Sequence, residues 1–382
     1  MANVLTNLAA DIYKAADVVG RELVGFIPAV TVNGDAVTRA AKGDTIRSHF
    51  TRTPTVSTSF APAMTIPEGT DQTVDNKTMV VDTFATVQIP WTGEDMKHVN
   101  NGSGFETIYG DQIRQAMRAI CNTIELSLFN TAYKAASRAV GTAGTTPFAT
   151  TIDPVADVRK ILVDNGCPMD GAVSLVMNTA AGTALRKVTN LYKVNESGGS
   201  DMLRQGVLLD LQGIMLRESA QISQVTKGTG ASYVTSGVTA IGTEDIALVT
   251  GTGTVLAGDV VTFAADATNK YVVGTGVAAP GTISLNEPGA MVSIATANPL
   301  TVGNSYTPNV AFHKSAIELA MRPPAMPMGG DAAVDMMTIQ DPFSGLVFEI
   351  AAYKGYQKAM FEVRCLYGSK AWKSQHIATV IG

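Results

Sequence analysis

The stretch FETIYGDQIRQAMRAICNTIELSLFNTAYKAA, residues 105–136, decides how the rest of the sequence is organised. Its apolar residues recur at spacings of three or four, namely Ile113, Met117, Ile120, Ile124 and Leu128. This spacing predicts one helix with a single apolar face. About 30 residues at 1.5 Å each give a length of roughly 45 Å. Because Ser103 and Glu106 form a capping box just before it, the pattern indicates a long helix that starts there and serves as a spine.

Upstream of this helix, the sequence contains one further helical pattern and then extended chain. Apolar residues from Leu5 to Leu23 recur at helical spacing, and Pro28 ends that pattern. Thr, Ser, Pro and Ala dominate residues 51–70, which is typical of an extended arm. Val87, Ile89 and Trp91 alternate with polar or small residues, so a strand is expected there.

Downstream of the spine, helix and strand signals alternate. Asp153 is expected to cap a helix with Pro154 at its first position, and Gly166 to end it. Residues 172–177 form a short apolar strand, after which Asn178 or Thr179 can cap another helix. The leucines from 208 to 216 indicate paired strands. This part of the chain is therefore expected to be α+β.

A composition change separates residues 227–302 from their surroundings. Gly, Thr, Val and Ala dominate this stretch, and it contains no Arg. Turn signals divide it into short strand candidates, namely 232–235, 246–250, 260–264, 271–274 and 282–285. These features predict a small all-β module inserted into the α+β protein.

The C-terminal region resumes the α+β pattern. The spacing of Phe312, Ala316, Leu319 and Ala320 predicts a short helix that the prolines at 323 and 324 end. Two alternating runs, 346–350 and 361–365, predict strands.

Composition excludes several classes of function. The chain has 382 residues, 46% hydrophobic and only 16% charged, against about 25% charged in an ordinary soluble domain. A net charge of −5 argues against a protein that grips nucleic acid, because such binding needs clustered Lys and Arg. No run of 18 apolar residues predicts a transmembrane helix, and the N-terminus lacks the basic region of a secretory signal. Cys121, Cys167 and Cys365 form no CxxC, so buried free thiols are expected rather than a disulfide.

Catalytic and metal-binding motifs are absent from the sequence. It has no P-loop, no dinucleotide-binding glycine motif, no HExxH and no GxSxG. The four histidines, His49, His98, His313 and His376, do not stand at ligand spacing, and local hydrogen bonds are expected for them. The adjacent acids Glu94-Asp95 and Glu244-Asp245 are interpreted as turn residues or partners of basic groups. We therefore predict no catalytic residues, no cofactor and no metal site.

Residues 306–323, YTPNVAFHKSAIELAMRP, carry a family resemblance. They resemble a segment of tailed-phage major capsid proteins, and are most similar to the P-twenty-two-like coat family, in which such a stretch follows an inserted β domain. The strand candidates at 258–263, 271–273 and 281–285 look like that insertion. The order of elements resembles the family along nearly the whole chain.

The resemblance implies the Hong Kong ninety-seven capsid fold, an α+β fold with a spine helix, an extended loop, and peripheral and axial domains. It implies an N-terminal arm at 1–40, an extended loop at 41–95, a spine helix at 96–137, a peripheral domain at 138–195 and 335–382, an axial domain at 196–225 and 303–334, and an inserted β-domain at 226–302.

The function that the resemblance implies is assembly rather than catalysis. Many copies, as hexamers and pentamers, would form an icosahedral shell around a scaffolding protein, with a portal, and would expand as double-stranded DNA enters. The DNA would be contacted non-specifically, a decoration protein is a further possible partner, and no membrane is involved. The shell would assemble in the bacterial cytoplasm and form the virion capsid.

Five charged residues are candidate contacts between subunits under this hypothesis. Arg47, Arg52 and Glu68 lie in the expected extended loop, and Glu244 and Asp245 lie in a loop of the insertion. Each of them is equally compatible with a solvated surface charge. Two other interpretations remain open. One is a bacterial encapsulin-type shell that encloses enzymes, which the β insertion disfavours. The other is an enzyme with an unrecognised site.

Overall fold

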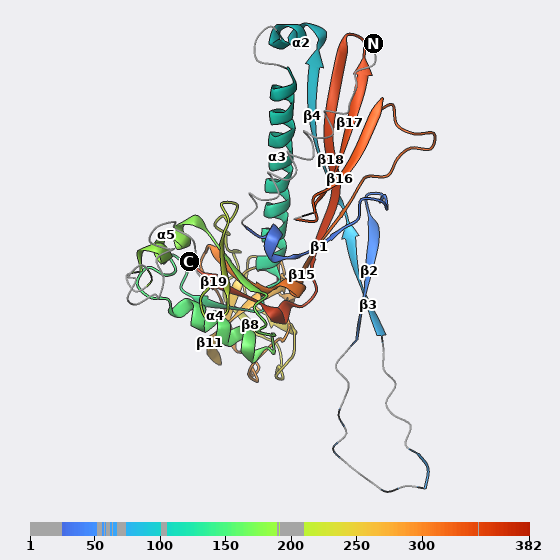
Figure 1. Ribbon diagram of the computed structural model, residues 1–382. Helices are drawn as coiled ribbons and strands as arrows, with labels where there is room; N and C mark the ends of the chain where they lie inside the picture. The colour runs from blue at the N-terminus through green and yellow to red at the C-terminus, as the bar shows by residue number, and fades with distance from the viewer. Residues whose placement is uncertain are drawn as a thin grey trace.

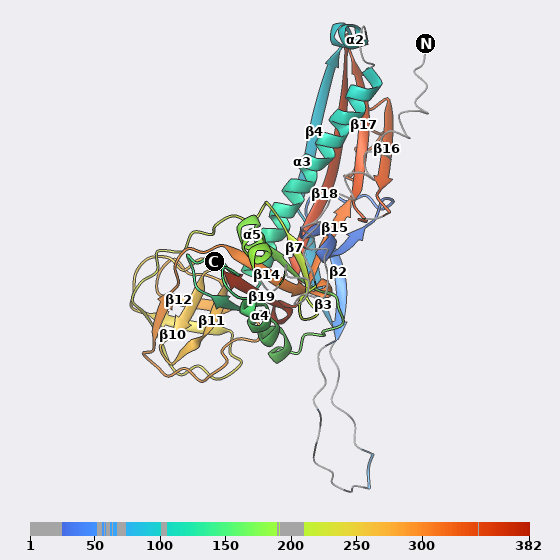
Figure 2. The same ribbon diagram turned by 60° about the vertical axis from the view of Figure 1, so that its left-hand side comes forward.

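The computed structural model describes residues 25–51, 56, 58, 62, 64–66, 74–100, 105–188, 191, 210–342 and 344–382. It has an elongated part, in which one long helix runs beside a sheet, and a rounded part that contains the helices α4 (Asp153–Asp164) and α5 (Thr179–Lys187) (Figure 1). A two-stranded hairpin extends away from both (Figures 1 and 2). The predicted helix over residues 5–23 and the capping box at Ser103 lie outside the described residues.

The elongated part is built on a six-stranded sheet in the order β1-β15-β18-β17-β16, with β4 paired to β18. Its strands are β1 (Thr31–Gly34), β4 (Thr83–Thr92), β15 (Ile317–Arg322), β16 (Asp335–Gln340), β17 (Val347–Gly355) and β18 (Lys358–Ala371). β18 has 14 residues and pairs antiparallel with β4, β15 and β17. The predicted strands at 87–91, 346–350 and 361–365 are confirmed as β4, β17 and β18, whereas β16 was not predicted.

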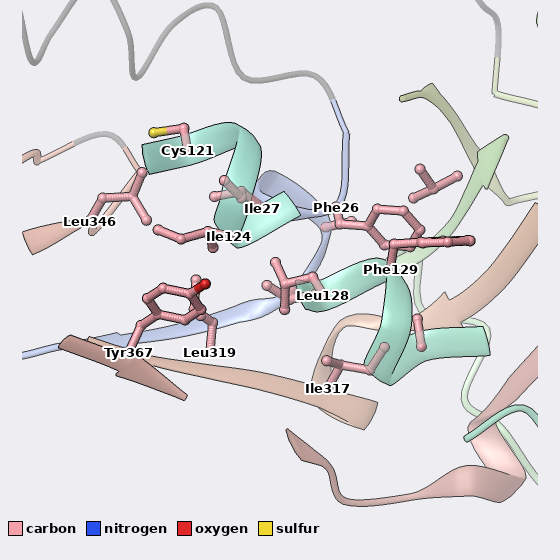
Figure 3. Close-up of a cluster of buried hydrophobic side chains, with 14 of the residues drawn as sticks. Phe26, Ile27, Cys121, Ile124, Leu128, Phe129, Ile317, Leu319, Leu346 and Tyr367 are labelled. Carbon is pink, nitrogen blue, oxygen red and sulfur yellow. The ribbon is translucent and has the colours of Figure 1, made fainter. Parts of the chain in front are cut away.

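The predicted spine is confirmed as α3 (Phe105–Lys134), a helix of 30 residues that follows α2 (Gly93–Asn100). The five apolar residues that predicted it are all buried. Figure 3 shows Ile124 and Leu128 of α3 facing Leu319 of β15 and Tyr367 of β18. Burying a Leu or Ile side chain of this kind stabilises the fold by about 1.5–3 kcal/mol. The spine is therefore held by one apolar stripe against the sheet.

The rounded part is organised by an eleven-stranded sheet in the order β10-β13-β8-β9-β12-β11-β5-β19-β14-β6-β7. Its strands are β5 (Arg138–Gly141), β6 (Val173–Met177), β7 (Met215–Glu218), β8 (Tyr233–Thr235), β9 (Asp245–Val249), β10 (Val260–Phe263), β11 (Asp266–Thr275), β12 (Gly281–Leu285), β13 (Pro299–Val302), β14 (Pro308–His313) and β19 (Ile377–Ile381). The described residues also form the single-turn 3-10 helices η1 (Ile27–Ala29), η2 (Lys314–Ala316) and η3 (Ser374–His376).

Two helices, α4 (Asp153–Asp164) and α5 (Thr179–Lys187), lie beside β19, β14 and β6 and share an apolar core with them. The predicted cap of α5 is confirmed, because the Asn178 side chain accepts a hydrogen bond from the backbone N–H of Ala181. The predicted cap of α4 is wrong by one position: Ile152 is the cap, and Asp153 is already helical. With Pro154 fixed near the helical φ, Asp153 places its charge in the first turn, where the helix dipole favours it.

All five strand candidates of the insertion are confirmed as β8 to β12, and a sixth strand, β13, was not predicted. These strands enclose a core that includes Tyr233, Phe263 and Tyr271. The module is nevertheless continuous with the rest of the protein, because β11 pairs with β5 through Tyr271 and Arg138. β5 in turn pairs in parallel with β19.

The predicted short helix over 312–320 is wrong. These residues form the end of β14, the single turn η2 and most of β15. β14 lies between β19 and β6 and is buried along its whole length, with Phe312 in one core and Ala311 in another. A strand that is covered on both faces is apolar on both and shows no alternation of apolar and polar residues. The apolar residues of this segment happen to be three or four positions apart, which is also the spacing expected of a helix.

The hairpin consists of β2 (Asp44–Thr51) and β3 (Val74–Val81), paired antiparallel from Asp44↔Val81 to Thr51↔Val74. At its base, Met79 and Val81 pack against Leu366 of β18. The sequence predicted extended chain in this region but not the pairing of β2 with β3, which the structure shows.

The strand pairings also bear on the predicted domain boundaries. Residues 138–195 and 335–382 were assigned to one peripheral domain. The structure places β5 and β6 in the eleven-stranded sheet with β19, whereas β16, β17 and β18 belong to the six-stranded sheet. The boundaries themselves stay a prediction.

Candidate functional site

The part of the chain that the structure describes contains no group of three or more His, Cys, Asp or Glu residues able to hold a metal ion. Within the same residues, no helix is long and apolar enough to cross a membrane. The acidic pair at 94–95 has a local role, since Asp95 accepts a hydrogen bond from the Thr92 hydroxyl at the start of α2.

The three cysteines are free and buried, as predicted. Burial raises the pKa of Cys121 to about 12 and that of Cys167 to about 11. It also raises the pKa of Cys365. Because the thiolate is the reactive form, these thiols are inert packing groups at neutral pH.

Two histidines that are distant in sequence lie close together in the fold. The ring centroids of His313 and His376 are 6.3 Å apart. Nε2 of His313 lies 3.1 Å from the Asp170 carboxylate, and its Nδ1 lies 2.8 Å from the Ser315 hydroxyl. Burial, then the charges of Lys373 and His313, lower the pKa of His376. The predicted local hydrogen bonds are thus confirmed for His313.

Glu125 is a buried carboxylate on the spine helix that the sequence analysis missed. It accepts hydrogen bonds from the backbone N–H groups of Phe26 (2.9 Å) and Ile27 (3.0 Å) and from the Ser219 hydroxyl (3.3 Å). Burial raises its pKa, and these hydrogen bonds oppose the effect. A Cβ at Gly25 would lie 2.6 Å from a Glu125 oxygen, so the chain approaches too closely for a side chain there. Glu125 therefore ties the start of the described chain to the spine.

The Phe26 ring strengthens this attachment. It stacks on Phe312 of β14 with the ring centroids 6.0 Å apart. It also contacts Phe129 of the spine, with the centroids 6.1 Å apart, and Figure 3 shows these two rings close together. A sequence signal for the site did exist. Glu125 lies four residues after Cys121 and four residues before Phe129, so all three share one face of the helix. An acid among the apolar residues of that face is the signal that points to this site.

A second charged cluster joins the strands of the elongated part. Glu349 of β17 has a fully buried side chain and lies 2.7 Å from the Arg364 guanidinium and 2.5 Å from that of Arg39. Arg364 also pairs with Asp331 and Glu362. The hydrogen bond from Tyr353, and to a lesser extent Arg364, lowers the pKa of Asp331. Glu362 and Arg364 are two residues apart in β18 and so lie on one face of the sheet, but their partners come from segments that no local pattern reveals.

The predicted contact residues are placed as follows. Arg47 is exposed on β2 of the projecting hairpin, opposite Thr78 of β3. Glu244 and Asp245 are exposed at the start of β9 in the insertion. Arg52 and Glu68 lie outside the described residues. The structure does not bring Arg47 together with the two acids, because they lie in the hairpin and in the insertion respectively. Their role as contacts between subunits stays a prediction.

The geometry of the hairpin is the feature best suited to a neighbour. β2 and β3 extend away from both sheets (Figures 1 and 2), and the base of the hairpin packs on its own chain through Met79 and Val81. A two-stranded hairpin by itself is marginally stable in water. Its length therefore offers hydrogen-bonding edges and side chains to another molecule.

Comparison with known proteins identifies the architecture. No protein-family model matches the sequence, and no curated protein is similar to it. Among solved structures, the capsid structure of the cyanophage P-SCSP1u matches 94% of this chain and 88% of its own, with 12% identity and a TM-score of 0.50. A Mycobacterium phage Che8 structure matches 94% and 91%, with 13% identity and a TM-score of 0.49. The mature capsid of bacteriophage PhiM1 matches 94% and 87%, with 12% identity and a TM-score of 0.47.

The likeness to the cyanophage capsid covers nearly all of both chains at low sequence identity, so it reports a shared fold. The elements described above agree with it: a spine helix beside a long-stranded sheet, a projecting hairpin, and a second sheet that carries the insertion. This chain has the α+β Hong Kong ninety-seven-type fold of phage capsid proteins.

Proposed function

We propose that this protein is the major capsid protein of a tailed phage, and that many copies assemble as hexamers and pentamers into an icosahedral shell around double-stranded DNA. The observation that carries the proposal is the fold shared along 94% of the chain with a phage capsid structure. Shell formation needs no catalytic constellation, and the proposal assigns none.

Assembly follows from surfaces that are weak one at a time. An exposed ion pair contributes at most about 1 kcal/mol. Arg47 on the hairpin, together with Arg52 and Glu68, would pair with charges on a neighbouring copy. Glu244 and Asp245 would do so from the insertion. In a closed shell each copy makes several such contacts simultaneously. The shell is therefore stable even though each single contact contributes little free energy.

The charge of the chain suits a wall that encloses DNA. A net charge of −5 keeps the subunit from adhering to the packaged polyanion, which it would contact non-specifically. A scaffolding protein would set the curvature of a precursor shell in the host cytoplasm, a portal would admit the DNA, and the shell would then expand.

Sedimentation velocity of the purified chain, with and without the scaffolding protein of its phage, tests the proposal. We expect a discrete, fast-sedimenting species in which hundreds of copies move together, formed alone or on addition of scaffold. A chain that sediments as a monomer or dimer with scaffold present, at several salt concentrations, refutes the proposal.

The contents of particles purified from cells separate this function from the shell of an enzyme compartment. The proposal predicts nuclease-resistant double-stranded DNA, or scaffold in particles made before packaging. A particle that instead encloses an enzyme as its major second protein contradicts the phage function while leaving shell formation intact.

A further inference from the structure

A cavity of about 350 Å³ lies at the β7 edge of the eleven-stranded sheet. Pro28 and Ala29 of η1 line one side of it. The other side is formed by Ser174 of β6, Arg217 of β7 and Lys314 of η2. The cavity thus lies between the segment that Glu125 anchors and the edge of the central sheet.

Strand register explains why these side chains meet. Ser174 of β6 is paired with Met215 of β7 and with Phe312 of β14. Arg217 is two residues beyond Met215, so it points to the same face of the sheet. Phe312 on that face contacts Phe26, which immediately precedes η1. Lys314 follows β14 directly, and its backbone N–H donates to the carbonyl of Ala172.

Within the described part of the chain, the charged groups of both cationic side chains in the cavity make no hydrogen bond and no ion pair. Arg217 is partly buried, its guanidinium makes no hydrogen bond there, and its Nε is shielded from solvent. Burial lowers the pKa of Arg217, and the nearby charge of Asp210 opposes this. Lys314 is exposed at the cavity, and its ammonium group makes no ion pair within the described residues.

A buried hydroxyl in the same cavity is also unsatisfied. Ser174 is 1% exposed, and its Oγ has no hydrogen-bond partner in the described structure. A buried polar atom without a partner costs free energy, and in native proteins it calls for an explanation such as a bound group. The one acid in the lining, Asp170, already accepts from the backbone N–H of Ala172 and faces His313.

We propose that this cavity binds an oxyanion, either a phosphate or a carboxylate group, held by Arg217, Lys314 and Ser174. A guanidinium presents paired N–H donors that match the oxygens of either group, and an ammonium adds charge without fixing geometry. The hydroxyl of Ser174 adds a neutral donor. The proposal goes beyond shell formation and holds for the single subunit.

Titration of unassembled subunit with inorganic phosphate, and separately with acetate, tests the site at constant ionic strength set with chloride. We expect saturable binding by calorimetry and a matching rise in melting temperature. Arg217→Gln removes the charged donors and is expected to weaken binding about tenfold or more. Arg159→Gln, on the exposed side of α4, is the matched control and is expected to bind as the unmodified chain does.

The two anions distinguish the source of the ligand. Preference for phosphate identifies a phosphate-bearing ligand, and preference for acetate identifies an acidic side chain of another copy or protein. If Arg217→Gln does not fold, Lys314→Gln at the exposed position is expected to weaken binding several-fold instead. Absence of saturable binding of either anion, or equal binding by the unmodified chain and the folded variants, overturns the proposal.

Discussion

At the scale of single residues, Glu125 shows how one acid on the spine organises a distant segment. Its carboxylate is buried and accepts three hydrogen bonds, two from backbone N–H groups almost 100 residues earlier in the chain. The replacement Glu125→Ala would leave these donors buried without an acceptor. We expect it to lower the free energy of unfolding by about 3 kcal/mol or more.

Urea denaturation of the unassembled subunit measures this change. Asp157→Ala, an exposed acid on α4, is the control and is expected to stay within about 0.5 kcal/mol of the unmodified chain. Equal stability of Glu125→Ala and the control would show that the carboxylate does not hold the Phe26 segment.

The raised pKa of Glu125 predicts a pH dependence with a definite sign. Burial raises this pKa above the ordinary value of 4.5, so over the range just above 4.5 the folded state binds more protons than the unfolded state. The stability that Glu125 contributes is therefore full below pH 4.5 and falls as the pH rises through the folded pKa. The measurement is the difference in unfolding free energy between the unmodified chain and Glu125→Ala from pH 4 to pH 8. A difference that grows with pH contradicts the assignment.

At the scale of elements, the spine was the most predictable part of the molecule and the strands around residue 312 the least. The spine has one buried face, so its apolar residues keep the helical period. β14 and β15 are buried along nearly their whole length, so their sequences carry no clear alternation, and a helix was predicted over residues 312–320. Pairings such as Glu349 with Arg39 join segments about 300 residues apart, which no local pattern encodes.

Two leucines of the spine, two residues apart, test which of its faces supports the fold. Leu128 is fully buried in the main core, whereas Leu126 is 41% exposed. We expect Leu128→Ala to destabilise the subunit by about 2–5 kcal/mol. Leu126→Ala serves as the matched control, with an expected loss of about 1 kcal/mol or less. Similar losses for the two variants in thermal and urea unfolding would contradict the packing described for α3.

The charged cluster around Glu349 tests how β17 and β18 are joined. Arg364→Met leaves the buried Glu349 carboxylate with Arg39 as its remaining ion-pair partner. We expect this substitution to lower the free energy of unfolding by about 3–5 kcal/mol. In the double variant Glu349→Met/Arg364→Met, the buried Glu349 carboxylate that Arg364 compensated is also gone, so the loss should be smaller than the sum of the two single losses. Additive losses in a double-mutant cycle would show that the two groups do not interact.

At the scale of the whole molecule, the strands of the insertion were predictable but its connection was not. Turn residues mark the five predicted strands, whereas the pairing of β11 with β5 depends on contacts between distant segments. The result is a rounded part whose sheet continues into the insertion, beside an elongated part with a projecting hairpin (Figure 2). The resemblance to capsid proteins, rather than any local pattern, made this overall plan predictable.

The exposed charge of Arg47 on the hairpin tests assembly separately from folding. Arg47→Glu is expected to leave the melting temperature of the isolated subunit unchanged, because an exposed charge contributes little to stability. It is expected to reduce the fraction of chain that enters fast-sedimenting particles, since the lost contact is repeated at every copy. Arg159→Glu on α4 controls for the change in net charge. Normal assembly of Arg47→Glu would remove this residue from the candidate contacts.

The central claim is that this chain closes into a shell, and electron microscopy of the purified chain tests it most directly. Negatively stained samples, prepared with and without the scaffolding protein, are scored for closed particles. The account predicts hollow shells of uniform diameter with icosahedral symmetry. Fields that contain only single subunits or small irregular clusters, with scaffold present and over a range of salt concentrations, would contradict it.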